Sequence, residues 1–409
     1  MTNIVRIPVS ALEVGMYITD INNAWVPDNN LSRKGLIKNA KVIEQIIKLG
    51  VTEVYIDQGR GKAAEVGLSL SDINRRQAEQ LQALVARPYE RPSAKSVFDQ
   101  ALVEAKKIQS EATELVSKVM MDAKLGLPLD FGPAQETADA ILESLKSNQN
   151  ALLCVTQLRT KDRYLLEHSF NVSVLMGVLA SSLGFHGREL QALVSGALLH
   201  DVGKIRVHDN ILHKPGGLTP EEWEEMKRHV TYGEEFLCQD DSLAPEIIEI
   251  CAQHHERLDG SGYPRGLSAE QLPLHTRMAS VADVYDAVTA DRVYHQGMAP
   301  TTALKKMLEW SDAQQLDKNL VYQFIRCVGV YPPGAVVLLS NHRLAVVVSE
   351  HPSLMDKPVV KVVYHLDQRL LLPPYPLDLS EHACEVTITR AVDPRQYGLE
   401  ALTLLNAAL

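Results

Sequence analysis

The sequence predicts a multidomain, mainly α-helical protein, with a central all-helical bundle, a small N-terminal α/β module and a small C-terminal β-rich module. Three observations carry this prediction. The chain has 409 residues, of which 45% are hydrophobic, so it is long enough to bury more than one core. Apolar residues recur at three- and four-residue steps through its middle, as on the buried face of a helix. Runs of β-branched residues mark both ends.

Residues 1–67 are predicted to form the α/β module. They contain three β-like runs, IVRIPVSAL, GMYITDI and VTEVYID, and one amphipathic segment, AKVIEQIIKLG, before the last run. The amphipathic segment stops at Gly50, a residue favoured at helix C-caps, and residues 51–56 alternate apolar and polar as in a half-buried strand. Residues 68–95 are rich in Gln, Arg and Ser, which predicts an exposed linker.

The helical part divides into a connecting segment, residues 96–155, and a main domain, residues 156–330. The stretches VFDQALVEAKKIQSEATELVSKVM and ETADAILESLKSN show the helical repeat of apolar residues. The amphipathic segment 96–121 could also pack against a second copy of the chain, so a homodimer is one expectation. After Tyr331, the runs PPGAVVLLS, RLAVVVSE and PVVKVVYHL predict a β-rich module over residues 331–409.

Composition narrows the class of protein. The formal net charge of −10 disfavours a polymeric nucleic acid or an anionic membrane as partner, because both are captured mainly by dense Lys and Arg. The five cysteines are scattered and form no C-x-x-C pair, as is usual for reduced, cytoplasmic proteins. The N-terminus lacks a signal-peptide pattern, and the longest apolar stretches are shorter than the ~20 residues that span a bilayer. The expectation is a cytoplasmic protein without membrane insertion.

Histidines are concentrated in one region. Eight of the fourteen fall between His168 and His255. The apolar segment ELQALVSGALLHDVGKI ends in His200 and Asp201, with Lys204 three residues later. Burying a His-Asp pair is costly without partners, and a metal ion is a partner that uses both side chains. A second helical segment places His254 and His255 side by side before a glycine-rich loop.

The number of candidate ligands indicates two metals rather than one. His168, His229 and Asp283 lie in further helical segments. With His200, Asp201, His254 and His255 they make seven candidate ligands. Imidazole nitrogens with carboxylates suit iron or manganese, with zinc or nickel as the alternatives. Two divalent ions bridged by a carboxylate and a water fit seven ligands, and such a pair lowers the pKa of the water and orients it for in-line attack. Asp201 is the expected bridge.

The loop DGSGYPRG, residues 259–266, is the other unusual feature. Gly260 and Gly262 permit tight turns and let a ligand approach the main chain. Tyr263 and Pro264 offer flat surfaces for a guanine or ribose, and Arg265 offers a donor for phosphate. The alternative interpretation is a plain Gly-Pro connection between two helices.

The strings HDVGK, HHERLDGSGYP and VADVYDAVTADR resemble the HD-GYP subgroup of the HD phosphohydrolase superfamily, which consists of cyclic di-GMP phosphodiesterases. The resemblance covers about residues 156–330 and implies an all-helical HD-type bundle with a metal site at its centre. The N-terminal string VSALEVGMYITDINNAW resembles a small domain of unknown function, DUF3391, which often precedes this catalytic domain in Gram-negative bacterial proteins.

The resemblance also implies roles for individual residues. The ligands of one metal are then His168, His200, Asp201 and Asp283. The ligands of the other are Asp201, His229, His254 and His255. Asp201 and Lys204 are the implied catalytic residues. The implied substrate-binding residues are Lys204, Gly262, Tyr263, Pro264, Arg265 and Arg292.

Two departures from the family pattern matter. Some members hold a third metal with a glutamate four residues before the first histidine, but Tyr164 stands there in this chain, which favours two metals. The family's usual Arg-Pro-Tyr-Arg is here Arg292, Val293, Tyr294 and His295, so one phosphate contact is expected to be weaker or pH-dependent at His295.

The expected reaction opens cyclic di-GMP by attack of a metal-bridging water and so lowers cyclic di-GMP signalling. The expected product is linear pGpG, and further hydrolysis to GMP is an open alternative. Cyclic di-GMP is the expected small-molecule partner, and contacts with other cyclic di-GMP signalling proteins are a further expectation. Two alternatives belong to other classes. One is a catalytically weak receptor for the dinucleotide, and the other is an HD-type di-iron oxygenase.

Overall fold

The computed structural model describes residues 4–22, 35–48, 53–64, 68–69, 98–127, 129–158, 164–214, 216–290, 297–351, 354–381 and 384–408. The chain divides into two compact units. One contains Met1–Ala83 and His213–Glu224, and the other contains Leu84–Leu212 and Glu225–Leu409.

The first unit is built on an antiparallel sheet with the strand order β3-β2-β4-β1-β5. The strands are β1 (Ile4–Pro8), β2 (Tyr17–Asn22), β3 (Gly35–Leu36), β4 (Glu53–Asp57) and β5 (Leu68–Ser69), and the helix is α1 (Ala40–Lys48). Ile7, Val54 and Ile56 are fully buried in its core. The predicted α/β module is confirmed. Leu68 and Ser69, expected to open the linker, pair with β1 instead, and Gly50 lies outside the described residues.

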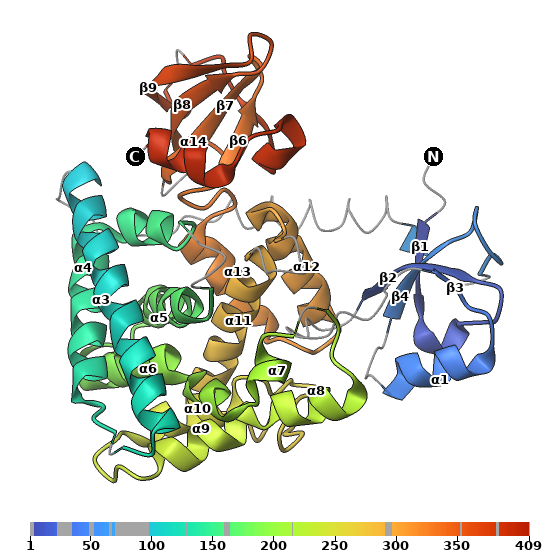
Figure 1. Ribbon diagram of the computed structural model, residues 1–409. Coiled ribbons are helices and arrows are strands. Elements are labelled where there is room, and N and C mark those ends of the chain that lie inside the picture. Colours follow the sequence, from blue (N-terminus) through green and yellow to red (C-terminus); the bar gives the residue numbers. More distant parts are fainter. Residues whose placement is uncertain are drawn as a thin grey trace. The chain divides into compact units, whose positions relative to one another are not determined.

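The second unit contains the predicted helical bundle (Figure 1). The helices of this part of the chain are α3 (Phe98–Lys124), α4 (Gly132–Val155), α5 (Tyr164–Ser182), α6 (Gly187–Leu199), η3 (Val202–Arg206), α7 (Asp209–Leu212), α8 (Pro220–Lys227), α9 (His229–Leu237), α10 (Pro245–Gln253), α11 (Leu274–Thr289), α12 (Pro300–Asp312) and α13 (Lys318–Val328). The first residues of α8, up to Glu224, are assigned to the first unit.

Helix α5 lies at the centre of the bundle. Residues 167–180 are all buried, and α5 packs against α3, α4, α6, α11 and α13. A helix that is apolar on every side belongs in a protein interior. A histidine near its start, His168, is therefore placed inside the domain rather than on its surface.

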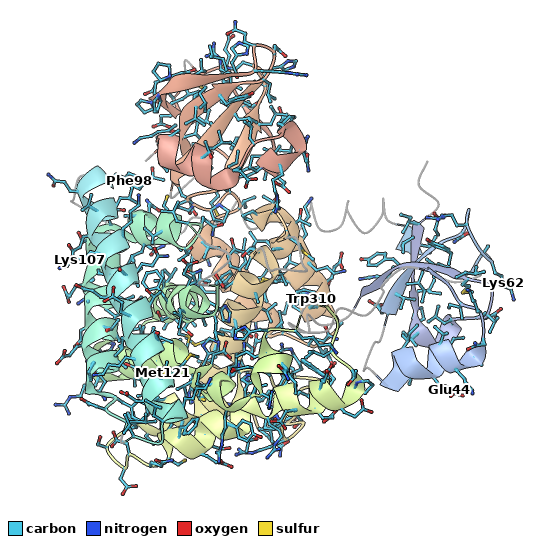
Figure 2. All side chains as sticks on the ribbon, viewed as in Figure 1. Glu44, Lys62, Phe98, Lys107, Met121 and Trp310 are labelled. Carbon is cyan, nitrogen blue, oxygen red and sulfur yellow. The ribbon has the colours of Figure 1, made fainter. Side chains whose placement is uncertain are left out.

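Polar side chains set the ends and bends of other helices. In α4 the backbone is non-helical at Asn148, and its Oδ1 accepts a hydrogen bond from the Ala151 N–H, so the helix restarts there as from an N-cap. Asp317 caps α13 by accepting from the N–H groups of Asn319 and Leu320. Trp310 of α12 is buried, whereas Met121 of α3 is half exposed (Figure 2).

The C-terminal module is an antiparallel sheet with the strand order β10-β6-β7-β8-β9. Its elements are β6 (Val336–Leu339), β7 (Arg343–Ser349), β8 (Val359–His365), β9 (Leu370–Asp378), β10 (Ile388–Ala391) and the helix α14 (Ala401–Ala408). Leu344 and Val346 face one core with Leu404 of α14, while Ala345 and Val347 face a second core. This alternation matches the two-residue period of a strand buried on both faces.

The mainly helical fold class with small β-containing modules at both ends is thus confirmed, while the finer domain boundaries stay a prediction. Within the described ranges, no helix is both long enough and apolar enough to cross a bilayer.

Candidate metal centre

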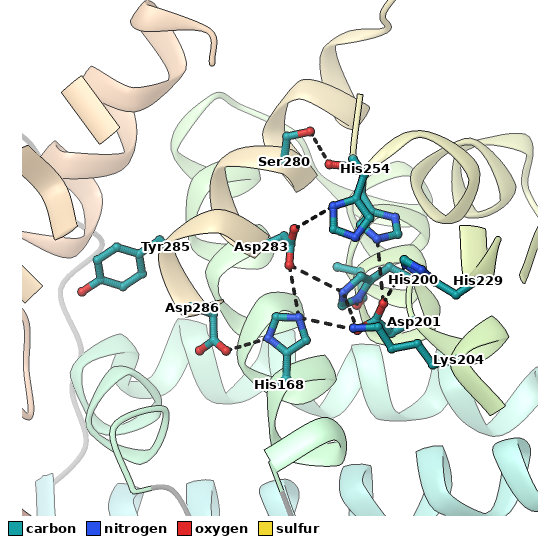
Figure 3. Close-up of polar contacts among 12 residues, drawn as sticks. His168, His200, Asp201, Lys204, His229, His254, Ser280, Asp283, Tyr285 and Asp286 are labelled. Carbon is teal, nitrogen blue, oxygen red and sulfur yellow. Dashed lines mark hydrogen bonds and ion pairs between the residues drawn. The ribbon is translucent and has the colours of Figure 1, made fainter. Parts of the chain in front are cut away.

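The seven predicted ligands meet in one buried cluster, although they come from different elements (Figure 3). His168 belongs to α5, His200 caps α6, Asp201 precedes η3, His229 begins α9, His254 and His255 follow α10, and Asp283 lies in α11.

Gly203 explains how two of these elements approach each other. A Cβ atom at Gly203 would overlap the carbonyl oxygen of His229 and the backbone nitrogen of Gly233. Only glycine permits this approach of η3 to α9. The glycine of the HDVGK string therefore brings Asp201 close to His229.

The ligand atoms form two groups. Within each group the candidate atoms lie within 4.8 Å of one another. Group A is His168, His200 and Asp283, and group B is Asp201, His229, His254 and His255.

Asp201 stands between the two groups. Its Oδ2 lies 3.6 Å from Nε2 of His168 and 3.4 Å from Nε2 of His200. Its Oδ1 lies 3.4 Å from Nε2 of His229 and 3.8 Å from Nε2 of His254. One carboxylate thus directs one oxygen to each group, which is the arrangement of a bridging ligand.

Backbone carbonyls orient three of the histidine rings. Nδ1 of His200 donates to the carbonyl of Ala197 at 2.7 Å, and Nδ1 of His229 donates to that of Met226 at 2.7 Å. Nδ1 of His254 lies 2.9 Å from the carbonyl oxygen of Cys251. These bonds leave the Nε2 atoms directed at the centre, as in metal-binding histidines.

His168 is oriented differently, by Asp286, a residue that is not among the predicted site residues. Its Nδ1 lies 2.7 Å from Oδ2 of Asp286, and its Nε2 lies 3.1 Å from Oδ1 of Asp283. Asp286 follows Asp283 by one helical turn, so both carboxylates lie on the same face of α11. The D-x-x-D spacing in VADVYDAVTADR was the available signal.

Several buried atoms of the cluster have no hydrogen-bond partner among the described residues. They are Oδ1 of Asp201, Oδ2 of Asp283, Nε2 of His200, Nε2 of His254 and both ring nitrogens of His255. Each buried polar atom without a hydrogen bond lowers the stability of the folded protein. Cations shared between these atoms would satisfy them together, so the residues present fit bound metal ions.

The protonation states of the buried ligands also favour metal binding. Burial lowers the pKa of His200, and it lowers that of His254 and His255 strongly, so these imidazoles are neutral at pH 7. Burial alone would raise the pKa of Asp201, but Lys204 and the neighbouring histidines hold it well below its ordinary value. These three imidazoles and the carboxylate of Asp201 are therefore in the forms that bind metals. His168 differs, because its contacts with Asp283 and Asp286 outweigh the effect of burial and raise its pKa.

The GYP loop, residues 259–266, lies against group B. The Tyr263 ring stacks on the His255 ring, with centroids 4.7 Å apart and planes at 28°. Both carboxylate oxygens of Glu256 accept backbone hydrogen bonds, from Arg265 at 2.8 Å and from Leu267 at 2.9 Å. A Cβ at Gly262 would overlap the backbone of Glu256, so glycine is required for this close packing.

The remaining predicted residues are placed less centrally. The guanidinium of Arg265 pairs with the carboxylate of Glu234. Pro264 follows Tyr263 through a cis peptide bond. Arg292 and His295 lie outside the described residues.

Comparison with known proteins adds independent evidence. The HD domain family model matches residues 146–320, and the model described as a domain of unknown function, DUF3391, matches residues 4–134. The cyclic di-GMP phosphodiesterase PA4108 of Pseudomonas aeruginosa is 33% identical over 378 residues, covering 92% of this chain and 89% of that protein. The 3'3'-cGAMP-specific phosphodiesterase 3 of Vibrio cholerae is 34% identical, covering 56% of this chain and 48% of that protein.

Among solved structures, Bd1817, described as an HDG"Y"P protein from Bdellovibrio bacteriovorus, is 20% identical with a TM-score of 0.46, covering 78% of this chain and 98% of that one. The match to PA4108 extends over nearly all of both chains, through the helical bundle and both flanking modules. The chain therefore belongs to the HD-GYP family of HD-domain cyclic di-GMP phosphodiesterases.

Proposed function

We propose that this chain hydrolyses cyclic di-GMP at a dinuclear metal site, opening one phosphodiester to give linear pGpG and then cutting pGpG to GMP. The position of Asp201, with one oxygen toward each ligand group, is the observation that carries the proposal. The name of the Pseudomonas relative, matched over nearly its whole length, supports the choice of substrate.

Two divalent ions are proposed, iron or manganese, with zinc or nickel as alternatives. Group A with Asp201 would hold one ion, and group B would hold the other. When bound, such ions lower the pKa of a coordinated water and neutralise charge on phosphoryl oxygens. The two aspartate ligands and the adjacent Asp286 carry three negative charges against the one positive charge of Lys204, which leaves two negative charges in excess among these four residues. Two divalent cations reverse that sign and so make the site attractive to a phosphodiester.

Lys204 supplies the chain's own positive charge at the centre. Its Nζ lies 2.7 Å from Oδ2 of Asp201, and the residue is 5% exposed. A charge held rigidly in a buried site is not screened by water and needs little reorganisation during the reaction. We assign it to the phosphoryl oxygens, where negative charge grows as the bond to the leaving oxygen breaks.

The GYP loop is assigned to the substrate's guanine and ribose. Tyr263 is held against His255, so an aromatic surface borders the ligand cluster. Arg265 would have to leave Glu234 to reach a phosphate. Arg292 is proposed as the main phosphate clamp from the sequence resemblance.

Asp201→Ala tests the proposal. Anaerobically purified wild-type protein should contain two metals per chain and convert cyclic di-GMP to pGpG and GMP. The variant should lose hydrolysis and metal together, because the two cations would no longer share a screening carboxylate. Asp209→Ala, which removes an exposed carboxylate of α7, is the matched control and should behave as wild type.

Other results would select another function. Full activity of Asp201→Ala would exclude the dinuclear arrangement. Faster turnover of 3'3'-cGAMP than of cyclic di-GMP would show that 3'3'-cGAMP is the preferred substrate. Metal-loaded protein that binds cyclic di-GMP without turnover would be a receptor, and oxygen consumption with an organic substrate would indicate an oxygenase.

A further inference from the structure

The two ligand groups have different surroundings. In group A, Nδ1 of His168 is hydrogen-bonded to the carboxylate of Asp286, which is fully buried (Figure 3). In group B, Nδ1 of His229 and of His254 is hydrogen-bonded to backbone carbonyls. A carboxylate carries a full negative charge, whereas a carbonyl is only a dipole, so the partner of His168 makes that ring the stronger metal donor.

Helix α11 holds His168 at both nitrogens. Oδ1 of Asp283 lies 3.1 Å from Nε2, and Oδ2 of Asp286 lies 2.7 Å from Nδ1. The ring is therefore fixed between two carboxylates one turn apart on a single helix. This contact prevents the ring from turning its Nε2 away from group A, so less ordering is left to occur when a metal binds.

A buried positive charge lies next to group B. Arg257 is buried, and its Nη1 donates to the carbonyl oxygen of His254 at 3.2 Å. Lys204 lies 2.7 Å from the Asp201 oxygen that faces group A, so each group has a cation beside it, and the difference between the groups rests on the carboxylate contact of His168.

We propose that Asp286 is a positioning residue that holds His168 and makes group A the tighter of the two metal positions, so that group A is loaded first. The inference rests on the two-metal site of the proposed function, but it concerns the order and strength of binding rather than the reaction.

The experiment is calorimetric titration of the metal-free protein with Mn²⁺, without substrate. Wild type should show a tight and a weak step. Asp286→Ala should weaken the tight step by about 10- to 100-fold, the usual effect of removing such a partner, and leave the weak step unchanged. Asp286→Asn keeps an acceptor oxygen of the same size, so it should fall between wild type and the alanine variant.

Two further variants separate this role from a general effect on the fold. Glu249→Ala removes the carboxylate partner of His275, a pair at 2.6 Å that includes no candidate ligand, and should leave both steps unchanged. His229→Ala should remove the weak step and keep the tight one.

Several outcomes would overturn the proposal. A tight step of wild-type strength in Asp286→Ala would show that the contact has no role. Equal weakening of both steps, with Asp286→Asn no better than Asp286→Ala, would indicate packing alone. Loss of the tight step in His229→Ala would reverse the order. A wild-type protein that binds one Mn²⁺ would refute the two-metal site itself, whereas two-step binding without hydrolysis would refute only the proposed reaction.

Discussion

Lys204 and Asp201 form a buried ion pair inside the ligand cluster, with Nζ 2.7 Å from Oδ2. The same oxygen of Asp201 faces the histidines of group A, so the lysine adjoins the proposed bridge at the position where the first metal would bind. Lys204 can therefore act in catalysis or hold Asp201 in place. The two roles predict different metal contents when Lys204 is replaced.

Lys204→Ala is expected to lower kcat by about 10²- to 10³-fold with the metal content unchanged, because the lost charge acts mainly in the transition state. Steady-state kinetics and metal analysis of one preparation provide the measurement. The nearby Arg206 cannot replace the lysine, since its guanidinium is half exposed and paired with Glu235. Loss of metal in the variant would show instead that Lys204 positions Asp201.

Glu256→Gln is expected to raise KM by about tenfold and leave the metals in place. The amide oxygen can accept from Arg265 or Leu267, but the amide NH2 would face the other backbone N–H, so one of two hydrogen bonds to a charged acceptor is lost. Tyr263 would then be held less firmly over His255. Ser261→Ala, which removes an exposed side-chain bond to Asp259 in the same loop, is the control. If the variant instead loses metal and its kcat falls, the role of Glu256 is to position the ligand His255 rather than the loop that carries Tyr263.

Gly203→Ala is expected to destabilise the protein by about 1–3 kcal/mol, the usual cost of overpacking, and to weaken metal binding at group B. The added Cβ must push η3 away from the carbonyl of His229, which separates Asp201 from that histidine. Chemical unfolding and Mn²⁺ titration measure the two effects. Gly132→Ala, at the exposed start of α4, should be nearly neutral. Equal effects of both substitutions would refute the packing argument.

The metal-free protein is expected to lose stability as pH falls below about 6.5, the ordinary pKa of histidine. Burial lowers the folded-state pKa of His200, His254 and His255, so the unfolded chain binds more protons than the folded one in this range. His168 acts in the opposite direction, because carboxylate contacts outweigh burial and raise its pKa, but it is one group against three. Urea unfolding at pH 7.5 and 5.5 measures the difference. Equal or greater stability at pH 5.5 would contradict the expectation.

Helices and central strands could be predicted from the sequence because their apolar periods are regular. The strands β6, β7 and β8 coincide with β-branched runs, whereas β9 was not predicted, since LLLPPYPLD contains three prolines. Proline is tolerated there because β9 is an edge strand, whose outer N–H groups need no partner. β10 has only four residues and gives no clear alternation.

The candidate ligands could be predicted because their motifs are distinctive, but their partners could not. Asp286 has the same residue type and helical context as Asp283, and only the fold shows that it faces the other nitrogen of His168. Arg265 has the composition of a phosphate ligand, yet its pairing with Glu234 depends on how α9 packs beside the loop. Long-range contacts of this kind leave no periodic signal in the chain.

The ligands come from elements that are widely separated along the sequence, from His168 in α5 to Asp283 in α11. Ions bound by them would close several long loops at once and act as reversible cross-links, in a chain whose five cysteines are all free. Cross-links that exist only in the folded state shift the folding equilibrium toward it in proportion to how fully they are occupied. Metal supply would then set the resistance of this domain to unfolding and proteolysis as well as its rate of turnover.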